Sequence, residues 1–223
     1  KNKRTVQGDL TDAFSKVIKS DKYNLIGSGR TDSGVHANHQ TGNIILKTNM
    51  SAIEVKNAIN ANTKKDIFIN SCKIVNEKFN SRFSALRREY IYKIITTYNP
   101  IYRHLYWHLN YNLDLKKLTK CSDYLLGKKD FSSYCKASSL KENNVCIIYE
   151  SKWIFEKNQL IYTIKANRFL HHMVRYLVGT MIDVGRKKIS YKEFETLLLN
   201  KKHDNSIVKA PAYGLYLNKV HYD

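Results

Sequence analysis

The alternation of helical and extended patterns is the feature that most constrains how this chain can fold. In several segments apolar residues recur every three or four positions, as on the buried face of an amphipathic helix. Runs rich in Ile, Val and Tyr, which are typical of strands, separate these segments. We therefore expect a mixed α+β protein. The second expected helix starts at about 52 and includes 55–59. The other expected helices are 6–18, 115–125, 168–184 and 191–199. The expected strands are 43–47, 67–75, 89–97, 149–155, 160–166 and 215–222.

Capping residues support these helix starts. Ser51 and Ser190 are each followed three residues later by Glu, which is the capping-box pattern. Thr5 and Asp114 are expected N-caps for the first and third helices. The third helix should stop at Gly127, since glycine commonly ends a helix.

A natural domain break falls near residues 79–84, after a complete strand–helix–strand unit. We expect two α/β halves, 1–80 and 81–223, with a cleft between them. The first half would carry the loop around Asp32 that is described below.

Charge is the main compositional signal. The chain has 38 Lys and Arg against 19 Asp and Glu, a formal net charge of +19. Such an excess favours a polyanionic partner, because association releases counterions from phosphates. A Lys-rich composition that serves only solubility is the alternative.

Other bulk features exclude several classes of protein. There is no run of eighteen uncharged apolar residues, so we expect no membrane span, and the start KNKR lacks an apolar signal core. The four cysteines form no CxxC pair, which predicts reduced thiols in a cytosolic protein and no cysteine metal site.

The stretch GRTDSGVHA, residues 29–37, holds Asp32 between two glycines beside Arg30 and His36. A tight loop with polar groups in fixed directions is how rigid scaffolds present catalytic residues. An ordinary surface turn that uses Asp32 as turn-former is the alternative.

The stretch SRFSALRREYIY, residues 81–92, places Tyr90 and Tyr92 on one face of a strand. Aromatic rings next to arginines such as Arg82 form a surface on which unpaired bases stack while phosphates are neutralised. A pair of core tyrosines flanked by solvated arginines explains the pattern equally well.

The stretch NRFLHHMVRYLVG, residues 167–179, carries a buried stripe with Arg175 on the adjacent face, four residues from His171 and from Gly179. An arginine at the edge of an apolar stripe requires a carboxylate partner, and Asp32 is the candidate. Glycine inside a helix costs about 1 kcal/mol relative to alanine, so Gly179 indicates close backbone packing.

Together these stretches resemble the bacterial TruA-type tRNA pseudouridine synthases. GRTDSGVHA is similar to the family's catalytic loop, SRFSALRREYIY to its R-F-S-A…R-x-Y-x-Y segment, and FLHHMVRYLVGTMIDVG to the helix that carries its active-site arginine. APAYGLYL, residues 210–217, resembles its closing strand, and 60–62 and 129–133 are weaker matches. The resemblance runs in order from about residue 5 to 222.

The resemblance implies a pseudouridine synthase fold, in which two α/β subdomains share a largely antiparallel sheet with a central cleft. It also implies a homodimeric cytoplasmic isomerase that acts on tRNA, at positions 38–40 of the anticodon stem-loop, without cofactor or metal. Two departures stand out. The family's first strand and its Tyr-x-Gly…Gly-Trp-Gln segment are missing, so that we expect an unpaired sheet edge, and Thr63-Lys64 replaces its Leu-Pro.

The resemblance also assigns roles to particular residues. Asp32 would be the nucleophile that attacks C1′ of the ribose or C6 of the base, with the C1′ route and loss of the 2′ proton favoured. Arg175 would favour the ionised carboxylate and orient it, and Tyr90 would stack on the target base. Arg30 and Arg82 would hold phosphates or the extruded nucleotide.

Two other classes of function compete with this interpretation. A non-catalytic RNA-binding module explains the charge and the tyrosines, but not the pairing of Asp32 with Arg175. A metal-dependent hydrolase or deaminase is suggested by His104/His108 or His36/His39, yet the chain has neither HExxH nor the zinc-deaminase pattern. We expect His171 and His172 to lie on the polar face of the helix or to line the cleft rather than to bind metal.

Overall fold

The computed structural model describes residues 4–18, 24–200, 202 and 206–222. The chain forms two compact units, Lys1–Gly29 with Thr41–Ala85 and Arg30–Gln40 with Leu86–Asp223. From the sequence we expect a division at 80/81, with the Asp32 loop in the first half. By its contacts this loop belongs to the second unit, because its strand β2 (His36–Ala37) pairs in parallel with β9 (Leu215–His221).

The first unit packs helix α1 (Val6–Ile18) against α2 (Ala52–Asn62) through a small apolar core. The expected caps are present: Gly8 N donates to Thr5 Oγ1 at 3.0 Å, and Ser51 forms its capping box. Strand β1 (Ile26–Gly27) pairs with β3 (Gly42–Asn43). The buried core residues are Ala13, Phe14, Val55 and Ile59.

Two strands expected in this unit are not formed. Of residues 43–47 only Asn43 lies in a strand, and no described residue of 67–75 does. The side-chain amide of Asn60 binds the backbone N–H and C=O of Ile69, in place of a ladder to a neighbouring strand. The described strands thus form one sheet in each unit rather than a single shared sheet.

The second unit is built on a seven-stranded, largely antiparallel sheet in the order β2-β9-β4-β8-β7-β6, with β5 paired to the end of β4. The expected strands 89–97, 149–155, 160–166 and 215–222 are confirmed, within one to four residues at each end, and the mixed α+β class is confirmed with them. The strands not yet given are β4 (Arg87–Ile95), β5 (Trp107–His108), β6 (Gly127–Asp130), β7 (Val145–Glu156) and β8 (Gln159–Ala166).

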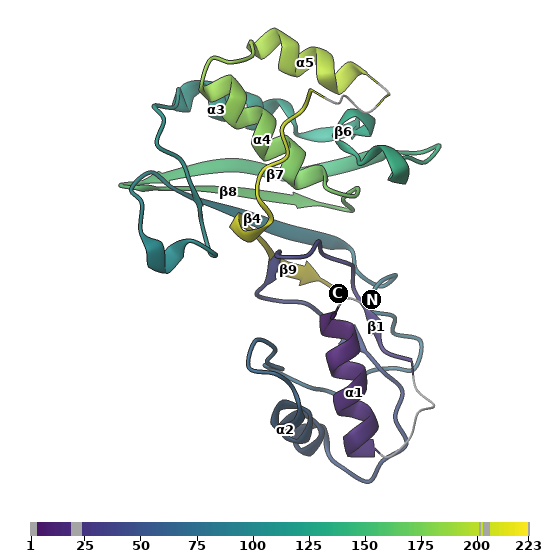
Figure 1. The fold of residues 1–223 in the computed structure, drawn as a ribbon. Helices are drawn as coiled ribbons and strands as arrows, with labels where there is room; N and C mark the ends of the chain where they lie inside the picture. The colour runs from purple at the N-terminus through teal and green to yellow at the C-terminus, as the bar shows by residue number, and fades with distance from the viewer. Residues whose placement is uncertain (1–3, 19–23, 201, 203–205, 223) are drawn as a thin grey trace. The chain divides into compact units, whose positions relative to one another are not determined.

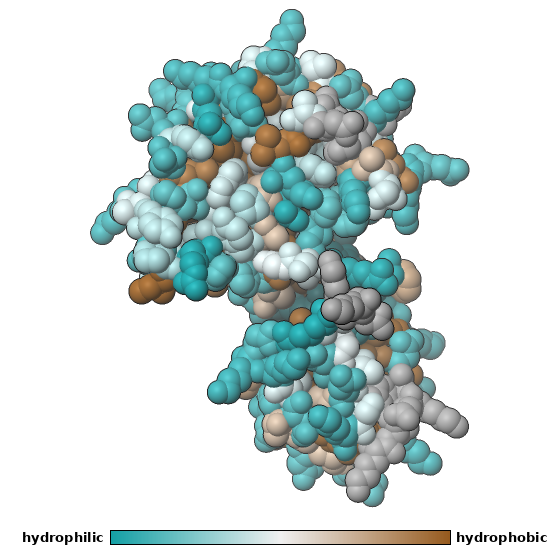
Figure 2. Space-filling model, viewed as in Figure 1, coloured by the Kyte–Doolittle hydropathy of each residue, from teal (hydrophilic) through white to brown (hydrophobic). Residues whose placement is uncertain are grey.

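Helices α3 (Leu115–Tyr124), α4 (Met173–Gly185) and α5 (Tyr191–Leu199) cover one face of this sheet (Figure 1). Their apolar stripes pack on the buried residues of β4, β7 and β8, while their outer side is largely hydrophilic (Figure 2). Asp114 caps α3 and Ser190 forms the capping box of α5, as expected. The short 3₁₀ turns are η1 (Pro100–Tyr102), η2 (Ser132–Tyr134), η3 (Ala137–Ser139) and η4 (Ala212–Gly214).

Helix α4 begins later than the sequence predicts. It starts at Met173 rather than at 168, because His172 has a left-handed backbone with φ of 68°. A left-handed residue cannot continue a right-handed helix. Among the described residues, no helix combines the length and the apolar character needed to cross a membrane.

Gly179 marks the close packing that its place inside a helix predicts. A Cβ atom there would lie 2.0 Å from the carbonyl oxygen of Val208 and 3.2 Å from Ala210 N. The neighbour is backbone, so it has little room to move.

Gly179→Ala is therefore expected to destabilise the protein by about 2 kcal/mol, since overpacking typically costs more than the helix propensity that alanine gains. Gly185→Ala in the same helix is the matched control, because its Cβ would first meet the flexible end of Leu118. Chemical denaturation of both variants measures the difference. Equal stabilities would contradict the tight contact with Val208.

Candidate active site

Asp32 lies on a loop whose shape is set locally. Val35 N donates to the Asp32 carbonyl at 3.1 Å, and Gly34 has φ of 83°, a left-handed conformation that suits glycine. Beyond the turn, Asn38 N donates to the Leu217 carbonyl at 2.9 Å next to the β2–β9 pairing. The loop is thus a tight turn that is fastened to the sheet on its C-terminal side.

His36 fixes the same loop to a second segment. Its Nε2 lies 2.8 Å from the His104 carbonyl oxygen, and its ring stacks on Tyr216 with centroids 4.7 Å apart. His36 thus bonds to the backbone of His104, not to its ring, and the ring of His108 packs against Tyr98. His36 and His108 each pack against a tyrosine ring, and His36 also fastens its loop to the segment of His104.

The expected ion pair between Asp32 and Arg175 is present. Arg175, in the first turn of α4, donates from Nη1 to Asp32 Oδ2 at 2.6 Å and from Nε to the Ala210 carbonyl at 2.8 Å. Both side chains are largely buried, with exposed fractions of 11% for Arg175 and 18% for Asp32. The guanidinium therefore joins the loop of Asp32 to the segment that precedes β9.

Two histidines complete the surroundings of the carboxylate. His172 Nε2 lies 3.3 Å from Asp32 Oδ2, and His171 Nε2 lies 3.6 Å from Oδ1. Ser139 Oγ contacts His171 Nδ1 at 2.8 Å and orients that ring. These contacts were not expected from the sequence, because the helix was predicted to begin at 168 rather than at Met173. The adjacent histidines just before Arg175 were the available signal.

His172 is held in its neutral form. Burial lowers the pKa of this imidazole to about 4; the charge of Asp32 opposes this shift, and His171, Lys209 and Arg175 add to it. Its Nδ1 is buried and has no hydrogen-bond partner in the part of the chain that the structure describes. A neutral ring can donate from Nε2 to Asp32 while Nδ1 carries a lone pair.

Asp32, His171 and His172 place ligand atoms within 4.8 Å of one another, a spacing that suits a metal ion. However, the Arg175 guanidinium already occupies Asp32 Oδ2, so a divalent cation would meet a positive charge at this carboxylate. The arrangement fits an ion-paired carboxylate better than a metal ligand set.

The pKa of His172 has a consequence for stability. Below its unfolded value of about 6.5, the unfolded chain binds the proton more readily than the folded one, so stability falls as pH drops towards 4. His172→Asn keeps a donor for Asp32 and removes this titration. The variant is expected to lose about 1–2 kcal/mol less stability between pH 7 and pH 5 than the parent. Denaturant titrations at both pH values test this, and parallel losses would show that folding does not lower the pKa of His172.

Tyr90 lies near this group from strand β4. Its ring packs edge-on against Phe169, with centroids 5.1 Å apart. Burial raises the pKa of Tyr90 to about 12, with a further contribution from the charge of Asp32, so the hydroxyl keeps its proton at neutral pH. Tyr92, by contrast, is fully buried and donates to the Pro211 carbonyl at 2.7 Å. Of the tyrosine pair, Tyr92 is fully buried in the core, whereas Tyr90 is partly buried and packs against the edge of that core.

The remaining two candidates, Arg30 and Arg82, are both exposed. Arg30 is exposed at the start of the loop, two residues before Asp32. Arg82 is exposed in the first unit, with its guanidinium 5.6 Å from the centre of the Phe83 ring. The second unit thus gathers Asp32, Arg175 and Tyr90.

Comparison with known proteins identifies a family. Residues 122–223 match the model of a family described as tRNA pseudouridine synthase. The tRNA pseudouridine synthase A of Bacillus licheniformis is 38% identical over 99% of this chain and 90% of its own length. The enzymes of that name from Bacillus subtilis strain 168 and Dictyoglomus thermophilum are 36% and 38% identical, each over 99% of this chain and 91% of their own lengths.

Proposed function

The chain belongs to the tRNA pseudouridine synthase A family, and on this premise we propose that it isomerises uridines of the tRNA anticodon stem-loop, at positions 38–40, with Asp32 as nucleophile. The observation that carries the proposal is the ion pair of Asp32 with Arg175, which holds a carboxylate on a rigid loop. A carboxylate kept in place and ionised is what covalent catalysis by aspartate requires.

The reaction needs no co-reactant. The N1–C1′ bond breaks, the uracil turns, and a C5–C1′ bond forms; C5 loses a proton and N1 gains one. In this proposal Asp32 adds to the nucleotide at C1′ or C6 and leaves again when the new bond has formed. Arg175 holds Asp32 Oδ2, so Oδ1 is the oxygen that faces the nucleotide. Arg30 and Arg82 bind phosphates of the tRNA.

Tyr90 is proposed to stack on the target base. Its raised pKa argues against a phenolate and in favour of a role for the ring. Tyr90→Phe is expected to retain turnover within a few-fold, whereas Tyr90→Leu should lose about 10-fold to 100-fold, because base stacking contributes about 1–3 kcal/mol. Single-turnover rates on tRNA separate the two. A large loss in the phenylalanine variant would show that the hydroxyl takes part in proton transfer.

The direct test of function is to incubate the protein with an unmodified tRNA transcript and to map pseudouridine by carbodiimide treatment and primer extension. We expect modification at positions 38–40 and none elsewhere. Pseudouridine at other positions would show that the enzyme modifies a different part of the tRNA. If no tRNA contained pseudouridine after incubation, the proposed activity would be contradicted.

The family also suggests how the protein acts in the cell. We propose a cytoplasmic homodimer, in which one tRNA contacts both subunits. Light scattering of the protein with and without tRNA tests this, and one tRNA bound to a monomer would contradict it.

A further inference from the structure

A recess lies at one end of the seven-stranded sheet, and its lining does not include Asp32, Arg175 or Tyr90. Its volume is about 450 Å³, and Lys128, Asn143, Asn167 and Arg168 line it together with the carboxylate of Glu142. Lys128 comes from β6, Asn143 precedes β7, and Asn167 and Arg168 follow β8. Segments distant in sequence thus form one polar recess with cationic groups on two sides.

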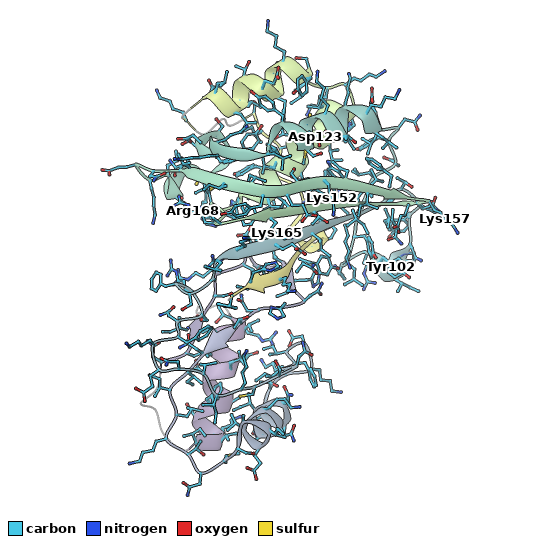
Figure 3. The ribbon with its side chains drawn as sticks, turned by 180° about the vertical axis from the view of Figure 1, so that it is seen from behind. Tyr102, Asp123, Lys152, Lys157, Lys165 and Arg168 are labelled. Atoms are coloured by element: carbon cyan, nitrogen blue, oxygen red, sulfur yellow. The ribbon has the colours of Figure 1, made fainter. Side chains whose placement is uncertain are left out.

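Strand register brings further cations to the same end of the sheet. Lys128 pairs with Ile147 between β6 and β7, and Arg88 pairs with Ala166 between β4 and β8. Arg88 Nη1 donates to the Asn167 carbonyl at 3.3 Å, and the Arg87 guanidinium lies 4.9 Å from the centre of the Tyr149 ring. Figure 3 shows Arg168 at this end of the strands, opposite Lys157 at the β7–β8 turn. Lys128, Arg87, Arg88 and Arg168 thus all lie at the same end of the sheet.

The recess is held in shape before anything binds. Asn167 Oδ1 accepts from Ile147 N at 2.9 Å and from Arg168 N at 2.8 Å. Arg168 Nη2 donates to the Asn143 carbonyl at 2.8 Å, so the guanidinium has a defined place. A preorganised cation loses little conformational entropy when it meets an anion.

The recess is also close to the site along the chain. Phe169, directly after Arg168, packs against Tyr90, and His172 follows only four residues after Arg168. Four residues span at most about 14 Å, a distance that a few nucleotides bridge. A polyanion whose target uridine lies at Asp32 can therefore reach Lys128 and Arg168 with its neighbouring backbone.

We propose that this recess binds the phosphate backbone of the substrate RNA a few nucleotides from the target uridine, with Lys128 and Arg168 as the main phosphate ligands. The inference rests on the proposed function, since it assumes that RNA is the substrate. Arg87 and Arg88 add positive charge at the same end of the sheet, and Glu142 is the acidic side chain in the lining of the recess.

The test compares two double variants that each remove two positive charges. Lys128→Gln with Arg168→Gln is expected to raise both Kd and KM for tRNA about 10-fold at 0.15 M salt, with kcat within two-fold. The slope of log Kd against log salt concentration should fall by about 1–2, since each phosphate contact contributes about 0.7–0.9. Lys116→Gln with Lys192→Gln, exposed on α3 and α5, is the matched control and should change neither constant by more than two-fold.

Arg168 also holds the loop at Asn143, so Lys128→Gln alone is measured in parallel, and thermal unfolding verifies that each variant folds. Bound tRNA should further protect Lys128 from acetylation. Unchanged Kd and salt slope in both recess variants, or equal losses in the control, would overturn the proposal. If the parent protein modifies no tRNA, the proposed function fails; if it does and these variants behave as the parent, only this inference fails.

Discussion

Asp32→Asn is expected to abolish pseudouridine formation, with a loss of at least about 1000-fold, while the variant still binds tRNA. The amide has the shape of the carboxylate and can still accept from Arg175. It lacks the negative charge that nucleophilic attack requires. Single-turnover incubation with labelled tRNA and a filter-binding assay measure the two quantities separately.

Asp123→Asn is the matched control for this experiment, because Asp123 is an exposed carboxylate on α3 of the same unit. Mass spectrometry must show that the amide introduced at position 32 has not deamidated, since deamidation would restore the carboxylate. Retained turnover would remove Asp32 from the nucleophile role. Retained binding without turnover would also exclude a purely RNA-binding module.

Arg175→Ala should reduce turnover about 100-fold to 1000-fold, because it leaves a largely buried carboxylate without its partner at a cost of about 3–5 kcal/mol. Arg175→Lys keeps the charge but should still lose about 10-fold or more, since one ammonium group does not reproduce the fork that binds Asp32 and Ala210 together. Single-turnover rates and denaturation curves of both variants provide the measurement.

Arg186→Lys serves as the control for the arginine series. Arg186 follows the other end of α4, stacks on the Tyr111 ring with its guanidinium 3.7 Å from the ring centre, and lies 3.8 Å from Asp183. We expect little change in turnover, and a loss of stability that reflects only the lost stacking on Tyr111. If Arg175→Lys were as active as the parent, Arg175 would act only through its charge, and the bond to Ala210 would have no part in placing Asp32.

The agreement between expected and observed elements is highest where local patterns decide the outcome. Ser51, Asp114 and Ser190 cap their helices as predicted, because a capping bond spans only three residues. Strands β4, β7, β8 and β9 lie where Ile, Val and Tyr accumulate, since each packs on a helical layer. Gly179 was correctly interpreted as a point of close backbone approach.

Predictions that needed a partner strand or a particular backbone angle were wrong. Residues 67–75 have the composition of a strand, but Asn60 binds their backbone where a ladder was expected. The apolar stripe extends back to Leu170 and the helix was expected from 168, yet α4 begins only at Met173 because His172 has a left-handed backbone angle. That angle turns the histidine ring towards Asp32, a contact that periodicity does not encode.

The sequence by itself determined the fold class, the family and the two charged groups at the centre of the site, because motifs and apolar spacing are properties of short segments. Only the tertiary structure decided that the Asp32 loop belongs with the second unit, that His171 and His172 surround the carboxylate, and that Lys128 and Arg168 share one recess. Strand register and backbone packing between distant segments determine these arrangements, and neither can be deduced from the order of residues within one segment.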